Sequence, residues 1–279
     1  MRTIFINNTI TENHIGCTLA IQSCYYYFKK YNIRITDTIY TNNLYKFYKK
    51  NYLNYDIYLI NGEGTLNNKN EGKGEYLLNI IKILIKNKKK IVLINCSIDL
   101  NDKNCKLLSR CSLISVREKK SYNKLKDFCK KGNLILTGDL IFNKFIEKKL
   151  YNFSKVQRNK NINILWFDTS LKPLREKVFK KAKENKFIYK NLLIKPQFFL
   201  IRTNPLRYLK YYLYSTIVLF FPYFGSSFNS LLFSHRYQII NIKNLISIIN
   251  QSKIIVTGRF HMTCILILLK KTFIAYEAN

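Results

Sequence analysis

The sequence contains no pair of cysteines with the C-x-x-C spacing of zinc or redox sites. Its seven cysteines are scattered and several lie in apolar segments, so we interpret them as reduced cytosolic thiols, most of them in the core. His14 and Cys17 have a metal-like spacing, but no second pair completes a ligand set. We therefore predict a protein without disulfide bonds and without a metal site.

Long hydrophobic runs are also absent. The N-terminal residues Met-Arg-Thr-Ile-Phe-Ile-Asn suit a strand and lack the apolar region of a signal peptide. The most hydrophobic segment, residues 211–224, is too short for a transmembrane helix and is interrupted by Pro222. Together these features predict a cytoplasmic protein.

Acidic residues are scarce: 16 Asp and Glu stand against 48 Lys and Arg, which gives a formal net charge of +32. Nucleic acid could bind such a chain, but the sequence has no zinc-finger spacing, no aromatic–glycine RNA signature and no basic region followed by heptads. Lys, Ile, Asn and Tyr all have AT-rich codons, so codon bias alone could supply much of the lysine. We therefore predict no nucleic-acid partner, and instead attraction to acidic sugars, phosphorylated lipid carriers or the inner face of an anionic membrane.

Short apolar runs alternate with segments of helical period along the chain, which is 279 residues long and 47% hydrophobic. The expected strands lie at residues 3–6, 33–40, 57–61, 90–95, 113–116, 134–136, 162–167, 187–199, 238–242, 253–256 and 273–276. The expected helices lie at residues 14–30, 43–52, 75–88, 103–110, 117–131 and 244–250. Another begins at Pro173, and a last one follows the turn at residues 257–261 and extends to about residue 271. This alternation predicts an α/β fold with mainly parallel sheets built of βαβ units.

A lysine- and asparagine-rich stretch with little apolar period divides the chain at residues 143–161. We interpret it as a linker. The sequence therefore predicts an N-terminal Rossmann-like lobe at residues 1–142 and a C-terminal Rossmann-like lobe at residues 162–279.

Two acidic residues follow predicted strands of the first lobe. Glu63 lies between Gly62 and Gly64, and the absence of neighbouring side chains leaves its carboxylate accessible. Asp139 follows Gly138 after a later strand, where it could instead cap a helix. Because ligands bind beyond the carboxyl ends of parallel strands, these carboxylates are candidates for acid–base roles.

A second candidate site lies at the predicted strand-to-helix turn Gly258–His261 in the second lobe. Gly258 lets the backbone approach a ligand, Arg259 can grip a carboxylate or phosphate, and His261 can transfer a proton near neutral pH. The helix N-terminus adds a further preference for anions. Arg117, after a strand, and His14, at a predicted helix start, are weaker candidates for substrate binding.

These candidate site residues lie in segments that resemble the polysaccharide pyruvyl transferases, and the resemblance extends over most of the sequence. The resemblance depends on the order and spacing of five segments: Asn13-His14-Ile15-Gly16-Cys17, Asn61-Gly62-Glu63-Gly64-Thr65-Leu66, Ser115-Val116-Arg117-Glu118-Lys119-Lys120-Ser121, Gly138-Asp139-Leu140 and Val256-Thr257-Gly258-Arg259-Phe260-His261. It implies two Rossmann-like lobes with a cleft between them, similar to GT-B glycosyltransferases.

The resemblance also implies a reaction, in which the pyruvyl group of phosphoenolpyruvate is moved onto two sugar hydroxyls as a ketal. The acceptor would be a glycan or lipid-linked sugar in capsule or exopolysaccharide biosynthesis. The Arg-x-His turn of the family maps onto Arg259 and His261 as the phosphoenolpyruvate contact. His261 would act as general acid, Glu63 or Asp139 as general base and Arg259 as the cationic clamp, with no cofactor.

Two alternatives remain from the sequence. A GT-B-type glycosyltransferase that uses a nucleotide-activated, Kdo- or sialic-acid-like sugar would need the same kinds of residues. The chain also has Thr272 where the family usually has proline, and it ends at Asn279 where the family often continues. These departures would fit an inactive, truncated binding remnant.

Overall fold

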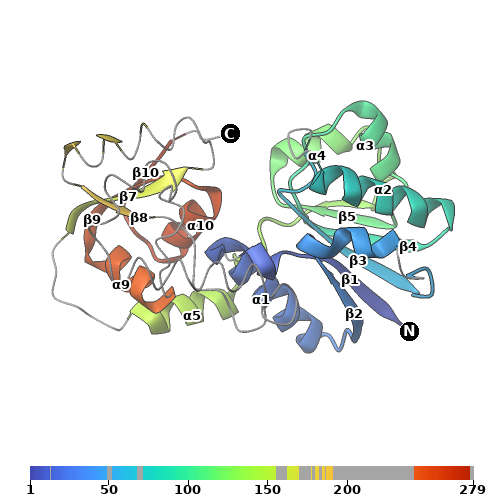
Figure 1. Cartoon of the computed structure of the whole chain (residues 1–279), viewed down its shortest axis with the longest axis horizontal. Coiled ribbons are helices and arrows are strands. Elements are labelled where there is room, and N and C mark those ends of the chain that lie inside the picture. Colours follow the sequence, from blue (N-terminus) through green and yellow to red (C-terminus); the bar gives the residue numbers. More distant parts are fainter. Residues whose placement is uncertain are drawn as a thin grey trace. The chain divides into compact units, whose positions relative to one another are not determined.

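The computed structural model describes residues 1–12, 14–48, 52–67, 72–154, 162–169, 177, 180–181, 184–185, 187–190 and 242–276. By its internal contacts the chain divides into a first unit, Met1–Glu12 with Ala20–Leu140, and a second unit, Asn13–Leu19 with Ile141–Asn279. Each unit contains its own sheet, in which every pair of neighbouring strands is parallel (Figure 1). The α/β class with mainly parallel sheets, expected from the sequence, is thus confirmed.

The sheet of the first unit has six strands in the order β2-β1-β3-β4-β5-β6. Its strands are β1 (Thr3–Asn8), β2 (Ile35–Tyr40), β3 (Ile57–Glu63), β4 (Lys90–Cys96), β5 (Leu113–Val116) and β6 (Leu134–Leu136). The chain moves from β1 to one side for β2 and to the other side for β3. Parallel sheets have a crevice at such a reversal, just beyond the carboxyl ends of the strands, and ligands bind there.

Alternate residues of the central strands supply two separate cores, because successive side chains of a strand point to opposite faces. Ile4 and Ile60 pack on one face with α2 (Lys73–Lys86). Phe5 and Leu59 pack on the other face with α1 (Ile15–Lys30). Since both faces are covered, the strands have the nearly continuous apolar sequences that predicted them.

The remaining helices of the first unit are short: η1 (Thr9–Glu12), η2 (Thr41–Tyr48), α3 (Asp102–Leu108) and α4 (Lys119–Leu125). The helix expected at residues 43–52 is a 3₁₀ helix over residues 43–48, which belong to η2, whereas Tyr52 lies in a turn. Asn43 has non-helical dihedral angles there. Asparagine favours such local breaks because its side chain competes for backbone hydrogen bonds.

The sheet of the second unit has four strands in the order β10-β9-β7-β8. They are β7 (Ile162–Thr169), β8 (Ile188–Lys190), β9 (Ser252–Gly258) and β10 (Phe273–Ala275). The described helices of this unit, besides the first turn of α1, include α5 (Lys144–Ser154), α9 (Ile242–Gln251) and α10 (Phe260–Leu268). Buried Leu245 and Ile265 lie on α9 and α10, and buried Phe167 lies on β7.

Helix α5 lies within residues 143–161, where the sequence predicts a linker. Two features of the sequence account for the helix. Asn143 accepts a hydrogen bond from the Ile146 N–H at 3.0 Å, as an N-cap residue does. Ile146 and Leu150 are four positions apart and both are buried, so this short apolar stripe is enough to hold the helix.

Several expectations fall outside the described residues. They are most of the predicted helix from Pro173, most of the predicted strands at 187–199 and 238–242, the hydrophobic segment 211–224, Asn13 and the last three residues. Among the helices that the structure describes, none is both long and apolar enough to cross a membrane.

Candidate active site

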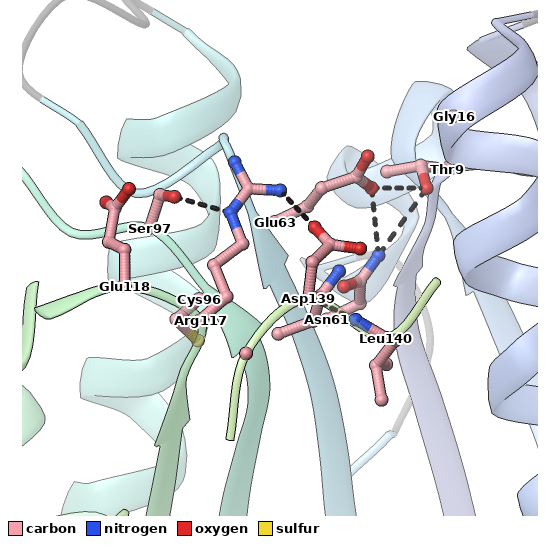
Figure 2. A network of polar contacts seen from close by, with 12 residues as sticks. Thr9, Gly16, Asn61, Glu63, Cys96, Ser97, Arg117, Glu118, Asp139 and Leu140 are labelled. Carbon is pink, nitrogen blue, oxygen red and sulfur yellow. Dashed lines mark hydrogen bonds and ion pairs between the residues drawn. The ribbon is translucent and has the colours of Figure 1, made fainter. Parts of the chain in front are cut away.

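Glu63 is the last residue of β3, at the reversal of strand order in the first unit. The accessible carboxylate expected from the sequence is wrong: Glu63 is buried, because neighbouring strand ends cover it where its own glycine neighbours do not. Its Oε2 accepts hydrogen bonds from the Thr9 hydroxyl at 2.6 Å and from the Asn61 amide at 3.3 Å (Figure 2). Its φ is 36°, in the left-handed region that non-glycine residues rarely adopt. Strained residues of this kind gather at functional sites, because the surrounding structure must hold them in place.

The polar residues around Glu63 come from the ends of β1 and β3. Asn7 also has a positive φ, 63°, and its amide donates to the Asn61 carbonyl at 2.6 Å and to the Thr65 hydroxyl at 3.1 Å. Asn61 donates back to the Asn7 carbonyl at 3.3 Å. These contacts tie the turn after β3 to the end of β1, and so fix the backbone that carries Glu63.

Asp139 lies in the loop after β6, where Gly138 takes a φ of 77°. Its Oδ2 forms an ion pair with Arg117 Nη1 at 2.9 Å, and Arg117 Nε donates to the Ser97 hydroxyl at 2.6 Å. Both charged side chains are buried. The hydrogen bond from Arg117 gives Asp139 a role in the first unit, where its carboxylate accepts from a guanidinium.

The two carboxylates gather at one edge of the sheet, as parallel strands predict (Figure 2). Burial raises the pKa of the Cys24 thiol, and the charges of Glu63 and Asp139 raise it further, so both carboxylates lie near the same side chain. We name Glu63, Asp139, Arg117 and Thr9 the carboxylate cluster. It combines two acidic groups with one cation inside the first unit.

The two glycines beside Glu63 have different reasons to be glycine. A Cβ on Gly62 would lie 2.2 Å from Cys96 Sγ and 3.1 Å from Cys96 Cα, so β4 leaves no room for a side chain. A Cβ on Gly64 would meet nothing closer than Arg117 Nη2 at 3.9 Å. Gly62 is therefore required by packing, whereas the space at Gly64 is open toward the guanidinium.

In the second unit, Arg259 separates β9 from α10. Its N–H donates to the Thr257 hydroxyl at 3.1 Å, and its carbonyl accepts from the Thr263 N–H at 3.0 Å, which starts the helix. The Arg259 side chain does not cap the first N–H groups of α10. Gly258, half-buried, precedes it. This turn combines a guanidinium with a helix N-terminus, which is a suitable arrangement for binding an anion.

His261 lies in the first turn of α10, and His14 lies beside it, with ring centroids 5.6 Å apart. Burial lowers the pKa of His14 well below its ordinary value, and the neighbouring His261 and Arg259 lower it further. His14 therefore stays neutral at neutral pH. His14 and His261 form what we name the histidine pair, and Arg259 precedes it in the turn.

The structure thus places the predicted site residues in two groups, one in each unit. The first unit holds Glu63, Asp139, Arg117, Gly62 and Gly64, and the second unit holds His14, Gly258, Arg259 and His261. Sequence reasoning missed Thr9, Asn61 and Ser97, which position the charged groups. The one signal for them was their place at a predicted strand end or within three residues after it.

Three solved structures resemble the chain. An uncharacterised protein from Klebsiella pneumoniae matches with a TM-score of 0.56 and 14% identity, over 99% of this chain and 83% of the other. The UDP-GlcNAc 2-epimerase of Methanocaldococcus jannaschii matches with a TM-score of 0.47 and 12% identity, over 99% and 83%. That of Neisseria meningitidis matches with a TM-score of 0.39 and 13% identity, over 92% and 78%. At these identities the first match supports the fold alone.

No curated protein matches the chain. The family model for polysaccharide pyruvyl transferases, in contrast, matches residues 14–278. That range contains the predicted site residues of both groups, among them Glu63, Asp139, Arg259 and His261. Because the match extends over nearly the whole sequence, the chain belongs to the polysaccharide pyruvyl transferase family.

Proposed function

We propose that this protein transfers the pyruvyl group of phosphoenolpyruvate to two hydroxyls of a sugar, as a step in surface-polysaccharide biosynthesis. The observation that carries the proposal is the turn at Arg259 and His261. It offers a guanidinium, a helix N-terminus and an imidazole within four residues of chain. Phosphoenolpyruvate has a phosphate and a carboxylate for the cations and an enol carbon for a proton donor.

The reaction begins with proton transfer to C3 of the enol, for which we assign His261 as general acid. C2 then has oxocarbenium character, and a sugar hydroxyl attacks it as a base takes the hydroxyl proton. The C2–O bond to phosphate breaks, and a second hydroxyl of the same sugar attacks C2, gives its proton to the departing phosphate and closes the ketal. The products are the pyruvylated sugar and inorganic phosphate, so no electrons enter or leave.

For the base we favour Glu63 over Asp139. Asp139 is engaged by the Arg117 guanidinium at 2.9 Å, which favours an orienting role. Glu63 accepts hydrogen bonds from neutral Thr9 and Asn61. Arg259 holds the donor, and Arg117, Gly64 and His14 remain proposed contacts of the substrates.

The transfer itself can be measured directly. The protein is incubated with phosphoenolpyruvate and a panel of glucosides, galactosides and mannosides, and released phosphate and acceptor mass are followed together. We expect phosphate release matched by pyruvylated acceptor, and loss of both in His261→Asn and Glu63→Gln. Turnover of a CMP- or UDP-sugar with no consumption of phosphoenolpyruvate would contradict the proposal and favour glycosyl transfer.

We further infer that the protein works in the cytoplasm, at the inner face of an anionic membrane that carries lipid-linked acceptors. The formal charge of +32 and the seven cysteines, which form no disulfide bonds, support this placement. Co-sedimentation with vesicles of anionic lipid should fall as salt rises, because exposed charges are screened. Equal binding to neutral vesicles, or binding unchanged at high salt, would contradict electrostatic docking.

A further inference from the structure

Gly16, in the first turn of α1, leaves the space that the His261 imidazole occupies. A Cβ built on Gly16 would lie 2.1 Å from His261 Cγ, 2.2 Å from its Cβ and 2.4 Å from its Nδ1. These three nearest atoms all belong to His261. No ordinary Cβ makes contacts this short, so any side chain on Gly16 would push the His261 ring aside.

The backbone of Gly16 does not itself call for glycine. Gly16 is helical and is absent from the described glycines with positive φ, which are Gly72, Gly132 and Gly138. Alanine is the better residue for a helix on intrinsic propensity. A glycine at this position therefore serves the close approach of the imidazole rather than a special backbone conformation.

The Gly16 N–H also orients the second histidine. It donates to His14 Nδ1 at 3.2 Å, so Nδ1 is an acceptor and the neutral ring carries its proton on Nε2. The His14 ring then lies at 53° to the His261 ring. One glycine thus contacts His261 through its Cα and His14 through its N–H.

We propose that Gly16 and His14 are positioning residues for His261, with Gly16 fixing the orientation of the imidazole and His14 packing beside it. The effect of this positioning on pyruvyl transfer rests on the proposed function, in which His261 is the general acid. A general acid must be held close to the atom that it protonates, here C3 of phosphoenolpyruvate. Misplacement of a catalytic group by about 1 Å costs on the order of 100-fold in rate. The packing relationship itself does not depend on the reaction.

The first test observes the imidazoles directly. The chain has three histidines, His14, His235 and His261, so ring ¹H–¹⁵N spectra are simple and single variants assign them. We expect Gly16→Ala to change the ring shifts and the pH profile of His261. Unchanged His261 signals in a folded Gly16→Ala protein would overturn the proposal.

Thr18→Val is the matched control, because Thr18 lies in the same turn of α1 and is also buried. Its hydroxyl has no hydrogen-bond partner among the described residues, so valine removes no contact. We expect His261 spectra like those of the wild type. Shifts of His261 as large as those in Gly16→Ala would mean that any change in this turn moves the ring, and would overturn a specific role of Gly16.

A double-mutant cycle covers the case in which Gly16→Ala folds poorly. Gly16→Ala should lower the thermal midpoint when His261 is present and should be tolerated in a His261→Gly background, where the Cβ and the ring are both gone. An equal drop in both backgrounds would contradict the proposal.

In transfer assays, Gly16→Ala should lower kcat about 100-fold with little change in the phosphoenolpyruvate KM. If the wild type transfers no pyruvyl group, only the proposed function fails, because the spectra and the cycle still decide the role of Gly16.

Discussion

Arg117 Nη1 donates to Asp139 Oδ2 across 2.9 Å, and only 8% and 1% of the two side chains are exposed. The pair joins the chain after β5 to the loop after β6. A buried ion pair of this kind is costly to break from one side, because the charge that remains is left without compensation. This relationship also separates the roles of the two carboxylates, since Asp139 is charge-paired while Glu63 is held by neutral donors.

Removal of one partner of this pair should therefore lower the free energy of unfolding more than removal of both partners does. We expect Arg117→Met and Asp139→Leu each to lower the free energy of unfolding by about 3–5 kcal/mol, and the double variant to lose far less than the sum. Urea unfolding of the four proteins measures this coupling. If the loss of stability in the double variant equalled the sum of the losses in the two single variants, the two residues would not interact.

Thr9 should matter to Glu63 through its hydroxyl alone. Thr9→Val removes the donor at 2.6 Å while it keeps the shape, and should cost about 1.5–3 kcal/mol, as for a hydrogen bond to a charged group. Thr9→Ser keeps the hydroxyl and serves as the control, with a smaller loss. The comparison is made by urea unfolding and by transfer rate. If the serine and valine variants had equal stability and equal transfer rates, the Thr9 hydroxyl would not support Glu63.

Gly62 and Gly64 allow a matched comparison of packing. Gly62→Ala forces a methyl against Cys96, and should cost about 1–3 kcal/mol of stability, as for an overpacked core. Gly64→Ala meets only the end of Arg117 at 3.9 Å and should cost less. Denaturant midpoints of the two variants check the order. A greater loss in Gly64→Ala would contradict the packing around β3 and β4.

The histidine pair predicts a loss of stability in acid. The pKa of His14 in the folded protein is well below the ordinary value of 6.5, so below that pH the unfolded chain binds a proton that the folded chain does not. Stability therefore falls as pH drops below about 6.5, with a slope of up to about 1.4 kcal/mol per pH unit from this residue.

His14→Asn tests this contribution. The asparagine oxygen can still accept from the Gly16 N–H, but the side chain does not titrate. We expect the difference in unfolding free energy between pH 7.5 and 5.5 to be smaller in His14→Asn than in the wild type. An identical pH dependence of the two proteins would mean that His14 is not held neutral by its surroundings.

The strands that carry the site could be predicted because their sequences are almost unbroken apolar runs between polar segments. Once Ile57–Glu63 is taken as a parallel strand, the position of Glu63 beyond the sheet edge follows from its place in the chain. The same reasoning located Asp139 and Arg259. These placements depend only on local pattern and on the shared direction of parallel strands.

The partners of these residues could not be predicted in the same way. Thr9 and Glu63 are 54 positions apart, and their hydrogen bond depends on β1 and β3 being neighbours at the reversal of strand order. Gly16 gave no sign of its contact with His261, because a glycine in a sequence does not tell which side chain needs its space. Helix α5 was missed because its apolar stripe is confined to Ile146 and Leu150.

The central claim is that the turn at Arg259 binds phosphoenolpyruvate, and thermal stability with and without this ligand tests it most directly. A ligand that binds only the folded protein raises its midpoint, by about 2.7 kcal/mol of stability at 100 times Kd. We predict a rise in the wild type and in the control Arg110→Ala, which removes an exposed arginine of the first unit, and no rise in Arg259→Ala. An equal rise in Arg259→Ala, or no rise in the folded wild type, would contradict the account.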